Sequence, residues 1–160
     1  MDITADFLIR SLELVSNPEG GYFRETYREP VTNRSGRAAV SIIYYLLTPE
    51  EPVGYLHRQA ADAIHYFHCG STLDVHTVDA EGRLNIHTMG ANLHTGQSLQ
   101  LVVPGNMWKA FELRGVPYAL ISEVVCPAWV AEEDERADSE FLQEYPHLRD
   151  DLQHLIQSKE

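Results

Sequence analysis

The sequence of 160 residues has little cysteine, few basic residues and no long apolar segment. Its two cysteines, Cys69 and Cys126, are too few for a disulfide framework and suggest reduced thiols in a cytoplasmic protein. The 12 Lys and Arg residues stand against 24 Asp and Glu, a net charge of −12, which argues against a nucleic-acid partner because a polyanion binds basic surfaces. No apolar run approaches the roughly 20 residues that span a bilayer, so no membrane partner is expected. The N-terminal residues also lack the basic and apolar regions of a signal peptide.

The composition is that of a folded globular chain, with 44% hydrophobic residues. A chain of this length can bury most of its unfolded surface in a single core. We therefore predict one domain that spans residues 1–160.

The chain begins with a helical pattern at residues 4–16. Thr4 can cap the N-terminus of this helix, and apolar side chains recur at helical spacing after it. Pro18 cannot continue the helix, and Gly20 and Gly21 permit a sharp turn. The segment is predicted to end there.

From about residue 20 to 130, short β-rich runs alternate with turns that contain Gly, Pro, Asn or Asp. The clearest runs are residues 22–28, 38–47, 64–68, 73–78, 84–89, 99–103, 107–113 and 118–126. Strands at spacings of roughly 8–12 residues are typical of an antiparallel sandwich or barrel. The absence of alternating strands and helices argues against a doubly wound or TIM-type fold.

Residues 131–160 form an acidic and helical tail. The four acids at positions 132–135 are interpreted as a solvated segment. The apolar residues that follow are suited to one or two helices, and Pro146 is expected to divide them.

Among the residue types that can act as bases or metal ligands, histidine is over-represented, with eight in the chain. In a regular strand, successive side chains face opposite sides of the sheet. His65 and His68 therefore cannot both enter one pocket. His65 is the candidate for the pocket, and a role as a filler of the core is the alternative.

These residues lie in a recognisable pattern. The block from His57 to Gly70 resembles the first sequence motif of the cupin superfamily, and residues 96–109 resemble the second. The segment 18–28, which begins Pro-Glu-Gly-Gly, the run at 41–47 and the Glu-Tyr-Pro sequence at 144–146 are similar to the cupin_5 family, a cupin group of unassigned function. The resemblance covers nearly the whole chain.

The resemblance implies an all-β fold, the cupin double-stranded β-helix or jelly-roll barrel. The short N-terminal helix would lie at residues 4–16, the barrel at about 20–130 and the C-terminal acidic and helical tail at 131–160. It also implies a homodimer that pairs sheet to sheet, which would cover exposed strand edges.

The metal ligands of metal-binding cupins are two histidines and a glutamate of the first motif and a histidine of the second. The matching positions here hold His57, Gln59, Ala63 and Lys109. One imidazole, an amide, a methyl and an ammonium do not make a complete set of ligands for zinc, iron or manganese. We therefore predict no metal ligands and no cofactor, and a rearranged site around His57 and Asp62 stays open.

The barrel topology is expected to gather a metal-free pocket with polar and aromatic walls. An imidazole near a lysine or arginine would bind an anionic group, and aromatic walls would hold a planar or sugar ring. The catalytic candidates are His57 and His65, and the ligand-binding candidates are Arg24, Tyr44, Gln59, Trp108 and Lys109.

Three functions remain in competition. We favour binding of a small polar or anionic molecule, such as a sugar or nucleotide, because binding requires only a pocket. The first alternative is a metal-independent sugar-nucleotide epimerase or isomerase. The resemblance implies a histidine base and a tyrosine acid for this activity, and His57 or His65 would be the base, oriented by an acid such as Asp62 or Glu123. The second is an inert structural or storage-like barrel. Whether the protein is an enzyme stays open, because one barrel hosts unrelated chemistries.

Overall fold

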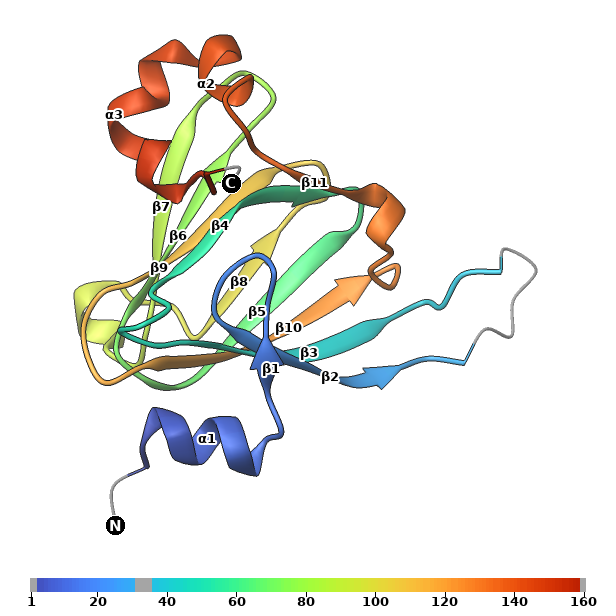
Figure 1. Cartoon of the computed structure of the whole chain (residues 1–160), viewed down its shortest axis with the longest axis vertical. Coiled ribbons are helices and arrows are strands. Elements are labelled where there is room, and N and C mark those ends of the chain that lie inside the picture. The colour runs from blue at the N-terminus through green and yellow to red at the C-terminus, as the bar shows by residue number, and fades with distance from the viewer. Residues whose placement is uncertain (1–2, 31–35, 159–160) are drawn as a thin grey trace.

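The computed structural model describes residues 3–30 and 36–158, and its central part is a barrel of two antiparallel sheets (Figure 1). The six-stranded sheet has the order β1 (Val15–Ser16), β2 (Tyr22–Arg28), β3 (Ser41–Leu47), β10 (Ala119–Cys126), β5 (Asp62–Gly70) and β8 (Gln100–Val103). The five-stranded sheet has the order β11 (Asp134–Arg136), β4 (Val53–Gln59), β9 (Trp108–Leu113), β6 (Leu73–Val78) and β7 (Leu84–Met89). The predicted all-β fold with short helical ends is confirmed.

Alternating side chains of the two sheets meet in the interior of the barrel. Strand β10 shows the alternation, since Ile121 and Val125 are buried and Ser122 and Val124 between them are half-buried. Phe67, Val75 and other buried apolar side chains form the core of the interior. Burying such side chains is the main stabilisation of a barrel of this size.

Helices cover the outer faces of both sheets. Helix α1 (Ala5–Ser11) packs Leu8 against the six-stranded sheet, where Leu46 and Leu120 meet it. The C-terminal helices α2 (Phe141–Glu144) and α3 (Arg149–Leu152), with the 3-10 turns η3 (Pro146–Leu148) and η4 (Gln153–Leu155), cover the five-stranded sheet (Figure 1). Pro146 divides the two C-terminal helices as predicted. No described helix has the length and apolar character needed to cross a membrane.

Two strands of the second sheet differ from the sequence expectation. Strand β4 lies outside the predicted runs, because Gly54 and three polar residues at 57–59 weaken its β pattern. Strand β11 forms within the acidic segment that was interpreted as solvated, so the barrel extends to Arg136. The N-terminal helix is also shorter than predicted, because Glu13 adopts a positive φ of 53° and the chain then pairs with β2.

The remaining 3-10 turns connect strands. Turn η1 (Leu93–Thr95) lies between β7 and β8, and η2 (Ala131–Glu133) leads from β10 into β11. Turn η2 therefore brings the chain from one sheet to the edge of the other. This crossing positions the site described next.

Candidate functional site

A cavity of about 380 Å³ lies between the two sheets and borders the apolar core, with which it shares Tyr45 and Phe111. Its walls come from strands β2, β3, β4, β9 and β10, from the turn after β1 and from the segment 129–136. The residues that line it are Asn17, Pro18, Glu19, Phe23, Glu25, Ser41, Ile43, Tyr45, His57, Gln59, Phe111, Glu123, Val125, Trp129, Ala131, Asp134 and Arg136. Most of these walls are apolar, and the polar groups gather in two clusters.

The turn after β1 places Glu19 against strand β4. The Asn17 Oδ1 atom accepts a hydrogen bond from the Glu19 amide at 3.0 Å, and the Tyr55 amide donates to the Glu19 carbonyl at 2.7 Å. Gly20 has a φ of +92°, and a Cβ there would lie 2.0 Å from the Val53 carbonyl oxygen. Only glycine permits this approach, so the Pro-Glu-Gly-Gly segment holds the Glu19 carboxylate in the cavity.

Strand β11 places Asp134 in the same cavity. Asp134 pairs with Gln59 of β4, and Arg136 pairs with His57. Both residues line the cavity. Glu135 lies between them on the opposite face and accepts a hydrogen bond from Arg58 at 2.7 Å. The strand alternation thus selects Asp134 from the acidic run.

The Nε2 atom of His57, which carries no proton, faces these two carboxylates. Its Nδ1 lies 2.8 Å from the Tyr55 carbonyl oxygen. A carbonyl only accepts, so Nδ1 carries the proton and Nε2 of the neutral ring keeps a lone pair. Burial, and then the positive charge of Lys109, lower the pKa of His57 and favour this neutral form.

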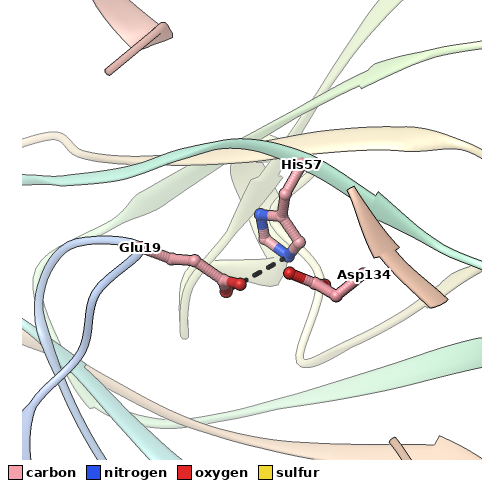
Figure 2. Close-up of side chains that lie close together, drawn as sticks. All are labelled: Glu19, His57 and Asp134. Atoms are coloured by element: carbon pink, nitrogen blue, oxygen red, sulfur yellow. Dashed lines mark ion pairs between the residues drawn. The ribbon is translucent and has the colours of Figure 1, made fainter. Parts of the chain in front are cut away.

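Glu19, His57 and Asp134 form the acceptor cluster, in which one ligand atom of each residue lies within 4.8 Å of the others (Figure 2). The Nε2 atom of His57 is 3.7 Å from Oε2 of Glu19. Burial, and then the hydrogen bond and charge of Glu19, raise the pKa of Asp134 to about 6. Three hydrogen-bond acceptors converge here, so the arrangement favours a bound proton or cation.

The second cluster meets the cavity at Glu123, and a positive charge within the cluster pairs with the Glu123 carboxylate. Lys109 lies 3.1 Å from Oε1 of Glu123, and His65 Nε2 donates to Oε2 at 2.8 Å. Lys109 and His65 are 1% and 0% exposed. Burial alone raises the pKa of Glu123, but Lys109 and His65 together lower it well below its usual range. We name this group the ion-pair cluster.

Gln59 lies opposite Asp134 in the strand register and is 7% exposed. Its Nε2 atom is buried and has no hydrogen-bond partner among the described residues, although the side chain lines the cavity. A buried amide without a partner costs about 1–3 kcal/mol, so Gln59 points to a molecule that accepts its hydrogen bond.

The structure brings together four of the seven residues that the sequence assigned to the pocket. His57 and Gln59 line the cavity. His65 and Lys109 lie directly behind Glu123, whose carboxylate they contact. The expectation that His65 and His68 face opposite ways is confirmed, because His68 contacts Ser122 on the outer side of the sheet.

Arg24 and Tyr44 lie outside the cavity, and their assignment to the pocket is wrong. They pair across β2 and β3 and share the face that packs toward α1. Arg24 donates to the Leu12 carbonyl and forms an ion pair with Glu13 at 2.6 Å. Because successive residues alternate, Tyr45 enters the cavity instead.

Trp108 and Asp62 also lie outside the cavity lining and make their contacts elsewhere. Trp108 lies under the C-terminal helices, with its ring centroid 5.2 Å from that of Phe141 and with the Arg58 guanidinium over its ring at 4.6 Å. Asp62 accepts a hydrogen bond from the Gly105 amide at 2.7 Å, so the structure does not bring it to His57. Both corrections follow from the side of the sheet on which the side chain lies.

Two residues of the acceptor cluster were missed from the sequence. Glu19 was interpreted as part of a turn, and Asp134 as part of a solvated acidic run. Residues 132–136 are all charged, so no apolar and polar alternation in the sequence distinguishes Asp134. No local signal placed Glu19 beside His57.

The metal position of metal-binding cupins does not fit the residues of this chain. Those positions hold His57, Gln59, Ala63 and Lys109, and the Lys109 ammonium is buried against Glu123. An ammonium repels a cation and donates no lone pair while protonated. These four residues therefore do not form the metal site of metal-binding cupins.

The family is shown by comparison with known proteins. The family described as "Cupin superfamily (DUF985)", Cupin_5, matches residues 6–137. This chain belongs to the Cupin_5 family. It is 34% identical to an uncharacterized protein of Saccharomyces cerevisiae, YML079W, over 93% of this chain and 78% of the yeast protein.

Solved structures of two proteins are similar over nearly the whole Cupin_5 chain. The protein SO0799 of Shewanella oneidensis has a TM-score of 0.92 at 31% identity and covers 99% of this chain and 100% of its own. A hypothetical protein of Leishmania major has a TM-score of 0.89 at 29% identity and covers 98% and 100%. A dTDP sugar isomerase of Desulfovibrio desulfuricans shares the fold alone, with a TM-score of 0.56 at 18% identity over 80% of this chain and 90% of its own.

Proposed function

We propose that this Cupin_5 protein binds a small polar organic molecule that carries several hydroxyl or amino groups, such as a sugar, in the cavity between its sheets. The observation that carries this proposal is the convergence of buried polar groups inside an otherwise apolar cavity. Its volume of about 380 Å³ lies in the range typical of small-molecule sites, roughly 300–1,000 Å³. Such a site combines apolar walls with a few placed polar groups.

The walls suit a ring with polar substituents. Phe23, Phe111 and Trp129 provide flat apolar surfaces, which pack against the faces of sugar and planar rings. Glu19 and Asp134 accept hydrogen bonds from hydroxyl groups, and the Gln59 amide donates one. The cavity can thus satisfy both donors and acceptors of one ligand.

The charge of the cavity favours a neutral or cationic ligand. Glu19, Glu25, Glu123 and Asp134 line it, whereas Arg136 is the one Lys or Arg among its described lining residues. Lys109 is held by Glu123. An anionic group would therefore meet repulsion at the acceptor cluster, and we propose that the ligand is neutral or cationic there.

No specific observation raises the epimerase to a second proposal. An epimerase of the kind expected needs a tyrosine acid opposite its histidine base. The Tyr45 hydroxyl already donates to the Gly20 carbonyl at 2.9 Å, and burial raises its pKa. The isomerase with a similar fold supports the fold only.

The experiment uses the fluorescence of Trp129, which lines the cavity. A Trp108→Phe variant leaves Trp129 as the sole tryptophan, since the chain has two. We would titrate this variant with monosaccharides, nucleosides, sugar nucleotides and polyamines. Saturable quenching by a neutral or cationic class supports the proposal, provided that Gln59→Leu weakens it and Arg24→Ala does not. No response to any class, or a response that Gln59→Leu leaves unchanged, overturns it.

The expected homodimer and cytoplasmic location are further proposals. Reduced thiols at Cys69 and Cys126 support the location, since neither forms a disulfide. Light scattering coupled to size-exclusion chromatography would test the dimer, and a monomeric mass at micromolar concentration would contradict it.

A further inference from the structure

We propose that Glu19, His57 and Asp134 form a divalent-cation site for a first-row transition metal such as Mn²⁺, Fe²⁺ or Zn²⁺. The inference deepens the proposed function and rests on it, because the cation would lie in the same cavity and orient the polar ligand. The donors differ from the four motif positions that metal-binding cupins use, and they share only His57 with them. The sequence analysis predicts a metal-free pocket without a cofactor, so this proposal departs from that expectation.

The donor set and its geometry suit such an ion. One imidazole nitrogen and two carboxylate oxygens are ligands that these metals accept. Bond lengths of about 2.0–2.2 Å place neighbouring donor atoms roughly 3–4 Å apart. The Nε2 atom of His57 and Oε2 of Glu19 are 3.7 Å apart, and all three donor atoms lie within 4.8 Å of one another. Small rotations of the carboxylates would complete the site.

The surroundings hold these donors in place. The Nδ1 atom of His57 donates to the Tyr55 carbonyl at 2.8 Å, which fixes the ring and leaves Nε2 for a metal. Histidine ligands typically make such a second hydrogen bond. The backbone of Glu19 bonds to Tyr55 and the side chain of Asn17, so its carboxylate begins from a fixed turn.

The charge around the cluster is balanced for a divalent ion. With both buried histidines neutral, the carboxylates of Glu19, Asp134 and Glu123 are opposed by the ammonium of Lys109, which leaves two negative charges. The two other charged lining residues, Glu25 and Arg136, carry one charge of each sign and do not change this sum. Neither Glu19 nor Asp134 has an ion pair with Lys or Arg among the described residues, and Asp134 Oδ1 accepts a hydrogen bond from the Trp129 indole at 3.4 Å. A cation with two charges would neutralise this group.

Gln59 supplies an independent observation that a ligand binds here. It is 7% exposed, lines the cavity and lies opposite Asp134 in the strand register. Its Nε2 is buried without a partner among the described residues. Three protein donors leave open positions on a metal ion. An oxygen bound at such a position would accept the Gln59 hydrogen bond.

The test is metal titration of the full chain after removal of metals with EDTA. We would measure Mn²⁺ binding by calorimetry and Co²⁺ binding by visible absorption. We expect one ion per chain, and an affinity that falls at least tenfold in Glu19→Gln and in Asp134→Asn. The matched control is Glu135→Gln, because Glu135 is the next residue of β11 and faces outward. Its affinity should stay within twofold of the wild type.

Each outcome decides the inference. No stoichiometric binding of Mn²⁺, Co²⁺ or Zn²⁺ at millimolar concentration overturns it. Binding that Glu19→Gln and Asp134→Asn leave unchanged also overturns it, since the ion would then sit on other carboxylates. Circular dichroism would confirm that both variants are folded.

The failure of this inference can be told apart from the failure of the proposed function. Trp129 fluorescence titrations would be repeated with EDTA and with Mn²⁺. Quenching by an organic ligand in EDTA, together with no metal binding, removes the cation site and leaves the proposed function. Metal binding without a response to any organic class retains the cation site and removes the proposed function.

Discussion

Two histidine–carboxylate clusters lie in the interior of one barrel, and they are completed in different ways. In the ion-pair cluster, Glu123 receives a hydrogen bond from His65 and the charge of Lys109. In the acceptor cluster, His57 faces Glu19 and Asp134, and the described residues provide no lysine or arginine to either carboxylate. In the first cluster, the fold itself pairs the charge of Glu123.

The difference separates a structural group from a binding group. A buried charge is tolerated when its partner is fixed beside it. Two half-buried carboxylates without a cation repel one another, and burial, together with the hydrogen bond and charge of Glu19, raises the pKa of Asp134. Removing a charge from the first cluster should therefore lower the free energy of unfolding, and removing one from the second should raise it.

The largest effect is expected from Lys109→Met. The substitution keeps most of the side-chain volume but leaves the Glu123 carboxylate buried with His65 alone. Breaking a buried ion pair costs about 3–5 kcal/mol. Urea denaturation at pH 7 measures the free energy of unfolding, and a loss below 1 kcal/mol would show that Glu123 has other compensation.

The opposite sign is expected for Asp134→Asn in metal-free protein. The amide removes a carboxylate that is close to Glu19, and its NH₂ group can donate to that oxygen. We expect the free energy of unfolding to rise by about 1 kcal/mol at pH 7, since relief of a buried like charge stabilises a fold. Denaturation in EDTA measures this, with Glu135→Gln as control, and a clear loss of stability would break the comparison.

The difference in stability between the wild type and Asp134→Asn should also depend on pH. The folded pKa of Asp134 is raised to about 6 from an ordinary value of 3.8, so the folded state binds the proton more tightly. The contribution of Asp134 to the free energy of unfolding is therefore favourable below its unfolded pKa and is lost as the pH rises through about 6. The gain from Asp134→Asn should be larger at pH 8 than at pH 4. Denaturation at several pH values measures it, and a gain independent of pH would contradict the shift.

The smallest effect is expected from Arg24→Ala. Arg24 lies on the outer face, where it forms an exposed ion pair with Glu13. Exposed pairs contribute about 0–1 kcal/mol. The stability should fall by no more than this, and ligand or metal binding in the cavity should not change in the fluorescence and calorimetric titrations. An altered affinity would place Arg24 in the site after all.

Much of the fold could be predicted because alternation and turn residues are local signals. Strands β2, β6 and β7 have the predicted bounds. Strand β4 was missed because its hydrogen-bond partners, rather than its residue types, hold it in the sheet. Strand β4 carries His57 and Gln59, and β11 carries Asp134, so two strands without a clear local pattern bear much of the site.

The sequence by itself determined the class of fold, the opposite directions of His65 and His68, and the loss of the usual cupin ligands at Gln59, Ala63 and Lys109. These follow from residue identity and from the two-residue period of a strand. Only the tertiary structure decided that Glu19 and Asp134, from the two ends of the barrel sequence, meet at His57. Their meeting depends on the turn that packs on β4 and on the pairing of β11 with β4, and such long-range contacts leave no periodic signal in the chain.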